Sequence, residues 1–233
     1  MSKQSSSVDS IGPTANQTVL AMSSAIALTS FGTMTRMHNY TAVGKHFAEV
    51  IMQEGVNGSH VTAHFGDPAS SWISTYPMGF DMMLGLNTFN ATTYKLQSDW
   101  YSTVISEYGM PLFSDVKYAV GDLVPWCAVT STDAVRDALI SGINAFLTDE
   151  LNNSPGPTRW YVTGPSPAPG TWPGTSSINK PTAGAYWILA AAKMYQCKDP
   201  MGCQGPPPLP PPSPPPPPPP PPPGKGPPHP PRH

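Results

Sequence analysis

Two aspartates stand where a carboxylate could do chemistry. Asp81 lies inside the otherwise apolar stretch from Trp72 to Phe89, where an ionised group must find partners or serve a reaction. Asp122 lies at the expected start of a helix. Paired carboxylates can protonate a leaving group and activate water, so Asp81 and Asp122 are the predicted catalytic residues. Each has a structural alternative: a helix N-cap for Asp122 and a buried pair with Arg, Lys or Tyr for Asp81. Asp67, after Phe65-Gly66, is interpreted as a turn residue.

Aromatic residues could line a pocket for a sugar or an amino acid, although tryptophans more often pack in a core. Trp172 lies in a Pro- and Gly-rich segment and is the best candidate for a contact made from a loop. The predicted substrate-binding residues are Trp72, Tyr76, Trp126, Trp172 and Lys180. The histidines are scattered without the spacing of a zinc site, so neither a metal nor another cofactor is predicted.

The segment around Asp81 carries a family resemblance. Trp72, Tyr76, Asp81 and Leu84-Gly85-Leu86 match the W-x-x-x-Y-N-x-x-x-D-x-L-L-G-L pattern of the fungal glutaminase A-type proteins, with Pro77 in place of the Asn. Further similar segments follow in the same order, at residues 97–101, 108–112, 120–126, 158–163 and 180–186. Together they resemble that family over roughly residues 15 to 195.

The resemblance implies a fold and an activity. The C-terminal domain of the family is an α/α toroid of the six-hairpin glycosidase kind, and its members release ammonia from L-glutamine outside the cell. The chain departs from the pattern at Arg159 and Val162, where the family carries acids, and at Thr182-Ala183, where the family carries Val-Val. These departures predict an altered or inactive copy. The family's greater length implies that this chain is the C-terminal part of a toroid, with earlier hairpins and a secretion signal missing.

Helical periodicity favours the same fold class. Val19, Met22 and Ile26 recur at helical spacing, as do Phe47 and Ile51 in the next segment, which predicts two antiparallel helices. Further helices are expected near residues 77–87, 91–108, 120–129, 132–149 and 182–195. The predicted fold is therefore all-α, a partial (α/α)6 toroid with a disordered polyproline tail. Half a toroid would leave apolar helix faces exposed.

Composition divides the chain into parts. The chain has 33 prolines, and the run from Pro206 to Pro223 is broken only by Leu209 and Ser213. Such a run cannot form a helix or a sheet and adopts an extended polyproline II rod. The predicted boundaries are a disordered N-terminus at 1–13, the toroid part at 14–196, a Cys-bracketed loop at 197–205 and a Pro-rich tail at 206–233.

The charge of the chain indicates which partners to expect, and its secretion and glycosylation signals indicate where in or outside the cell it is expected. The net charge is -2 and no basic patch stands out, so nucleic acid is not an expected partner. The first 13 residues lack the apolar region of a signal peptide, and the apolar stretch from Val19 to Phe31 is judged too short to span a membrane. Five glycosylation acceptors nevertheless favour a secretory route: Asn16, Asn39, Asn57, Asn90 and Asn152. By resemblance the protein is expected outside the cell or in its wall.

The cysteines agree with an oxidising compartment. Cys197 and Cys203 bracket a short loop and are predicted to form a disulfide, whereas Cys127 follows Trp126 in an apolar run and is interpreted as a buried small side chain.

Three functions stay open at this point. The first is a glutaminase A-type amidohydrolase acting on glutamine. The second is a glycoside hydrolase of the same toroidal architecture, using two acids. The third is a noncatalytic wall or interaction protein whose Pro-rich tail contacts cell-wall components or proline-binding domains.

Overall fold

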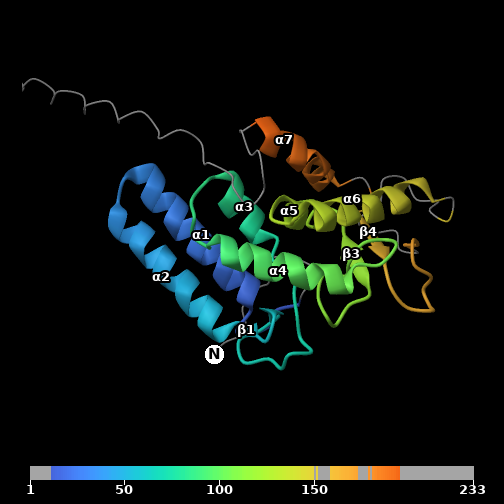
Figure 1. Ribbon diagram of the computed structural model, residues 1–233, viewed down its shortest axis with the longest axis horizontal. Helices are drawn as coiled ribbons and strands as arrows, with labels where there is room; N and C mark the ends of the chain where they lie inside the picture. Colours follow the sequence, from blue (N-terminus) through green and yellow to red (C-terminus); the bar gives the residue numbers. More distant parts are fainter. Residues whose placement is uncertain (1–11, 150, 152–157, 173–177, 179, 195–233) are drawn as a thin grey trace, which may run out of the picture.

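The computed structural model describes residues 12–149, 151, 158–172, 178 and 180–194 (Figure 1). Within them the chain is mainly helical, as the sequence predicts, with two small antiparallel sheets, β1–β2 and β3–β4. The helices are α1 (Thr18–Thr35), α2 (His38–Glu54), α3 (Pro77–Met83), α4 (Ala91–Val104), α5 (Val124–Val129), α6 (Asp133–Thr148), the 3-10 helix η1 (Pro181–Trp187) and α7 (Ile188–Met194). The strands are β1 (Val56–Asn57), β2 (His60–Val61), β3 (Tyr118–Val120) and β4 (Arg159–Tyr161).

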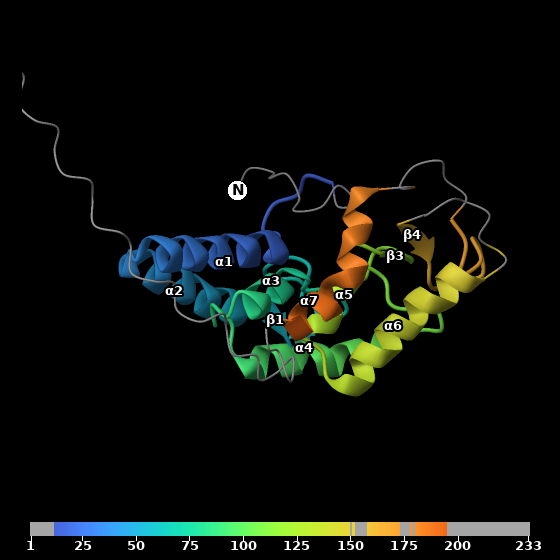
Figure 2. The same cartoon turned by 90° about the horizontal axis from the view of Figure 1, so that it is seen from above.

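The first two helices form the predicted antiparallel hairpin, which lies at one end of the molecule (Figures 1 and 2). Arg36 ends α1 in a left-handed conformation with φ of 59°, which reverses the chain. The two helices approach closely because glycine replaces a side chain at the contact. A Cβ on Gly44 would lie 2.4 Å from Thr29 Oγ1 and 2.6 Å from the Ala25 carbonyl oxygen. Helix α2 ends at Gly55, as predicted from the sequence.

Helix α1 is longer than the apolar stretch on which the argument against a membrane span was based. It has 18 residues with a mean hydropathy of 1.3, so by length and composition alone it would suffice to cross a membrane. The buried core helix of a globular domain meets the same criterion. Here Val19, Met22 and Ala25 are fully buried and Ile26 nearly so, and α1 packs along α2. The absence of a membrane span stays a prediction.

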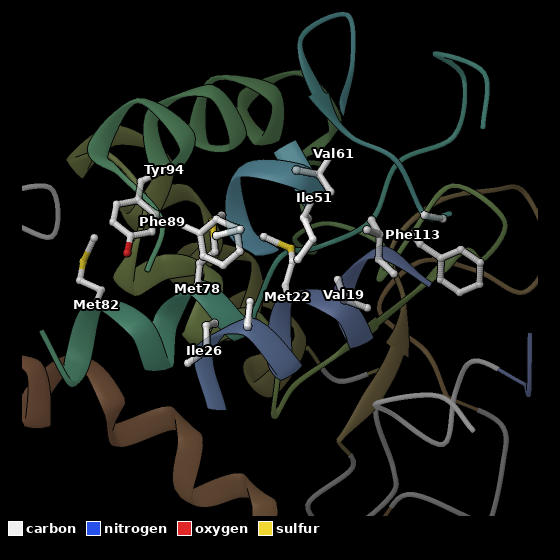
Figure 3. Packing of buried hydrophobic residues seen from close by; sticks show 14 of the residues in the cluster. Val19, Met22, Ile26, Ile51, Val61, Met78, Met82, Phe89, Tyr94 and Phe113 are labelled. Atoms are coloured by element: carbon white, nitrogen blue, oxygen red, sulfur yellow. The ribbon is translucent and has the colours of Figure 1, made fainter. Parts of the chain in front are cut away.

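A first core cluster joins the hairpin to the centre of the molecule. Figure 3 shows Met22 of α1 beside Met78 of α3 and Phe89 of the following loop, with Val19 next to Met22 on the side toward Phe113. Tyr94 of α4 belongs to the same cluster. Its hydroxyl points back toward the interior, where it meets Asp81.

A second core cluster lies at the other end of the molecule, around Trp160. This residue is fully buried on β4, stacks on Phe146 of α6 at 4.2 Å between ring centroids, and donates its indole N–H to the Tyr108 carbonyl at 2.7 Å. The β3–β4 pair aligns Ala119 with Trp160. The sequence predicts a helix from residue 120, but the chain remains extended to Val120 because β3 pairs with a strand about forty residues further on.

The hairpin leaves an apolar outer face. Seven large apolar residues on or between α1 and α2 are each at least 37% exposed: Phe31, Met34, Met37, Tyr40, Val43, Phe47 and Val50. We name this set the hairpin face. An apolar patch of this kind favours association in water.

We therefore expect the chain to associate through the hairpin face. Replacing Met34 and Phe47 by Lys removes apolar area and adds like charge, so the double variant should be monomeric where the parent forms larger species. Size-exclusion chromatography with light scattering measures the mass. Lysines at two exposed polar positions of α2, Asn39 and Gln53, supply the control and should leave association unchanged. A parent chain that is monodisperse, monomeric and melts cooperatively would contradict the expectation.

Candidate active site

Asp122 lines a pocket of about 390 Å³, which is formed by α3, α5, η1 and the start of α7. Its walls combine two aromatic rings, one carboxylate and one hydroxyl-bearing residue. Among the described residues that line it, Asp122 is the only acid. The lining residues, here named the Asp122 pocket, are Phe80, Asp122, Leu123, Trp126, Pro181, Thr182, Gly184, Ala185 and Ile188.

Asp122 is placed by the turn that joins β3 to α5. Gly121 donates its N–H to the Thr158 carbonyl at 2.8 Å, and Leu123 donates to Val120 at 2.9 Å, so the chain reverses between strand and helix. Helix α5 begins at Val124, and its N-cap residue is Leu123, without a side-chain cap bond. The interpretation of Asp122 as a helix cap is therefore wrong; the residue is half-buried and lines the pocket instead.

An aromatic wall closes one side. Phe80 of α3 packs on Trp126 of α5, with ring centroids 4.0 Å apart and an angle of 37° between the rings. The two helices come this close because Gly79 has no side chain: a Cβ there would lie 2.6 Å from the Trp126 carbonyl oxygen. The structure thus brings the predicted residues Asp122 and Trp126 together in one pocket.

Tyr186, which was not predicted from the sequence, lies close enough to Asp122 for the charge of the carboxylate to act on it, although it lines a neighbouring hollow beside α6 and not the Asp122 pocket itself. Its hydroxyl is buried, has no hydrogen-bond partner among the described residues, and lies where a Cβ on Gly121 would approach to 2.5 Å. Burial, and secondarily the negative charge of Asp122, raise the pKa of Tyr186 to about 12. The phenol therefore stays neutral near pH 7 beside the carboxylate. The one signal in the sequence was its place at the end of the 180–186 segment.

Asp81 lies elsewhere and is fully buried. Its Oδ1 accepts the Thr88 N–H at 3.0 Å, and its Oδ2 accepts the Phe89 N–H at 2.9 Å and the Tyr94 hydroxyl at 2.7 Å. Burial, and then Asp81 itself, raise the pKa of Tyr94 well above its usual range. Three donors around one carboxylate hold the loop between α3 and α4, so the geometry favours the structural alternative for Asp81.

The other predicted substrate-binding residues separate into different places. Trp72 is 7% exposed and packs edge-on against Trp100, and Tyr76 is 4% exposed in the second core cluster. Both positions favour packing. Trp172 packs on Tyr161 at 5.3 Å, beside the β3–β4 sheet. Lys180 immediately precedes Pro181 of the Asp122 pocket, at the N-cap position of η1.

Two of the departures from the family pattern, Arg159 and Val162, have structural roles of their own, whereas the third, Thr182-Ala183, places Thr182 in the lining of the Asp122 pocket. Arg159 lies with its guanidinium 5.7 Å from the centre of the Tyr118 ring, a cation–π geometry. Val162 is 2% exposed within the second core cluster. Neither residue lines the Asp122 pocket.

The remaining predicted residues divide into described and undescribed ones. Asp67 has the predicted turn role, because its Oδ2 accepts the His64 backbone N–H at 3.1 Å and the Ser71 hydroxyl at 2.6 Å.

Cys127 is fully buried, and burial raises the pKa of its thiol to about 12, which suits a packed side chain. The described residues contain no cluster that could hold a metal ion. Cys197, Cys203 and Asn152 lie outside the described residues.

Four predicted glycosylation acceptors are described. Asn39 and Asn57 are exposed, and Asn90 is exposed as the N-cap of α4, where its Oδ1 accepts the Thr93 N–H at 2.9 Å. Asn16 is less suited to carry a glycan, because the residue is half-buried. Glycosylation of these residues stays a prediction.

Comparison with known proteins gives two matches. The model of the glutaminase A six helical-hairpin domain matches residues 1–190. Glutaminase A of Aspergillus oryzae is 27% identical over 161 residues, which cover 64% of this chain and 23% of that protein. The chain thus spans less than a quarter of the length of this curated relative. No solved structure matches the chain.

Proposed function

Because the chain belongs to the glutaminase A six helical-hairpin domain family, we propose that it hydrolyses L-glutamine to L-glutamate and ammonia, with the reaction in the Asp122 pocket. The name of its relative, Glutaminase A, supports the substrate class. The proposal includes an extracellular location, for which the exposed acceptors Asn39, Asn57 and Asn90 are the supporting feature.

One observation carries the proposal: a half-buried carboxylate in a pocket large enough for an amino acid. In the proposed reaction, Asp122 takes a proton from water as the water oxygen forms a bond to the amide carbon. The tetrahedral intermediate then loses ammonia, whose nitrogen receives the proton from Asp122. The bond that breaks is the amide C–N bond, and the products are a carboxylate and ammonia.

Neighbouring groups fit two further needs of this reaction. An oxyanion forms on the amide oxygen and requires a donor or a cation. We assign this role to the hydroxyl of Thr182, a lining residue that stands where the family pattern has Val, and to the ammonium of Lys180, two residues earlier in the chain. Phe80 and Trp126 form the apolar wall against which the methylene groups of the substrate would pack.

The glycoside hydrolase alternative is less well supported. That chemistry uses two carboxyl groups across the scissile bond. Among the described residues, the Asp122 pocket contains one acid, and the side chain of Asp81 is engaged with Thr88, Phe89 and Tyr94. The noncatalytic alternative differs by predicting no turnover at all.

The test is a comparison of substrates with the purified chain. We expect ammonia release from L-glutamine, measured with a coupled glutamate dehydrogenase assay, and no release of aryl alcohol from nitrophenyl glycosides. L-asparagine, shorter by one methylene, is the matched control and should react more slowly. Glycoside cleavage without ammonia release would favour the second function. A folded chain that neither turns over glutamine nor gains thermal stability from it would overturn the proposal.

A further inference from the structure

A second hollow, of about 380 Å³, lies on the side of the molecule where η1 and α7 meet α6. Three apolar side chains exposed in its walls are Ile140 and Leu147 of α6 and Trp187 of η1, exposed by 39%, 49% and 75%. Asn144 also lines it, one helical turn from each α6 residue. We name these four residues the Trp187 groove. Trp187 is the most exposed large apolar residue among those described.

This combination of groups suits one class of ligand. Polyproline II segments bind in grooves lined by aromatic residues, where the pyrrolidine rings pack on the aromatic faces. Their backbone carbonyls have no internal hydrogen bonds and accept from donors beside the groove. The Trp187 groove offers an exposed indole, aliphatic walls and the N–H groups of an exposed amide.

The chain carries such a ligand itself. We propose that the proline run Pro206–Pro223 binds to the Trp187 groove of its own molecule. The run contains 18 residues, and a polyproline II rod of that length extends about 55 Å, more than a groove of this size requires. The proposal is independent of catalysis in the Asp122 pocket.

The connection between groove and run is long enough. Helix α7 follows Trp187 directly and ends at Met194, so it carries the chain roughly 10 Å from the groove. Residues 195–205 then separate α7 from the run, and eleven residues can span up to about 36 Å. The run can therefore return to the groove.

Two further properties favour binding within one molecule. A tether of this length gives an effective concentration on the order of millimolar, so even a weak contact would be populated. Because the rod is stiff before binding, little conformational entropy is lost when it binds.

The experiment compares two full-length chains, the parent and a variant in which the prolines of 206–223 are replaced by Gly and Ser at unchanged length. Iodide quenching of tryptophan fluorescence reports exposure, and Trp187 is the most exposed indole described. If the dissociation constant for the tail is near its effective concentration, half of the parent molecules have the tail bound in the groove. Iodide then quenches Trp187 about twofold less in the parent than in the Gly/Ser variant. The difference should be the same on dilution.

Two variants locate the contact. Trp187→Phe should abolish the difference between the two tails, and Leu147→Asp, which leaves all six tryptophans in place, should raise quenching of the parent to that of the Gly/Ser variant. Circular dichroism checks that each variant is folded. Equal quenching with both tails would overturn the proposal, as would a difference that persists in Trp187→Phe. Protection that disappears on dilution would indicate contact between molecules and would also overturn it.

Discussion

Replacing Asp122 by Asn is expected to reduce glutamine turnover by about 10²- to 10⁴-fold while leaving the melting temperature nearly unchanged. The amide cannot accept the proton of the attacking water, whereas its size is the same. Stability should hold because Asp122 provides no cap bond to α5 and is only half-buried at the pocket. Steady-state kinetics gives the turnover, and differential scanning calorimetry gives the melting temperature.

The control is a matched loss of charge away from the pocket. Asp115 is exposed and accepts a hydrogen bond from the hydroxyl of its neighbour Ser114, so Asp115→Asn should leave both quantities unchanged. If Asp122→Asn retained full activity with a lowered melting temperature, the catalytic assignment would be rejected. If the parent has no turnover, binding of glutamine to parent and variant replaces kinetics as the measurement.

Replacing Asp81 by Asn should lower the melting temperature and preserve turnover per folded molecule. The new amide presents N–H donors to a site that already holds the N–H groups of Thr88 and Phe89 and the Tyr94 hydroxyl. At least one buried donor then lacks an acceptor, and breaking such a buried arrangement costs about 3–5 kcal/mol of folding free energy. For a domain of this size the melting temperature should fall by roughly 10 °C.

Tyr94→Phe is the graded companion to this variant. It removes one donor and leaves the carboxylate with both backbone partners, so a loss of about 1–2 kcal/mol is expected. Chemical denaturation measures the loss of folding free energy in both variants, provided that the denaturant dependence of the unfolding free energy (the m-value) is unchanged. Turnover per folded molecule should be preserved in each variant. Loss of turnover at an unchanged melting temperature in Asp81→Asn would restore this residue as a catalytic candidate.

Much of the helical architecture could be predicted from local sequence. The apolar spacing in α1 and α2 and the glycine at residue 55 determine where these helices bury themselves and where the second one ends. Asn90 is a favoured N-cap residue and does begin α4. Such signals operate within a few residues of one another, so the chain alone carries them.

The family could be predicted from sequence for a different reason. The segment from Trp72 to Leu86 contains many residues whose side chains are needed together in one core: Met78 is fully buried, Trp72 and Tyr76 nearly so, and Asp81 holds the next loop. Interdependent packing limits substitution at all of these positions at once. The same motif was therefore informative about the fold and misleading about catalysis.

The candidate site depended on contacts that local patterns do not encode. Whether Asp122 caps a helix or faces a pocket depends on β3 pairing with β4, which extends the chain to Val120 and delays α5 to Val124. The position of the Tyr186 phenol depends on Gly121, 65 positions earlier, because a side chain at Gly121 would collide with it. The sequence by itself determined most of the helices and the family. Only the tertiary structure decided which carboxylate lies in a pocket, because that choice depends on the space left when residues distant in sequence pack together.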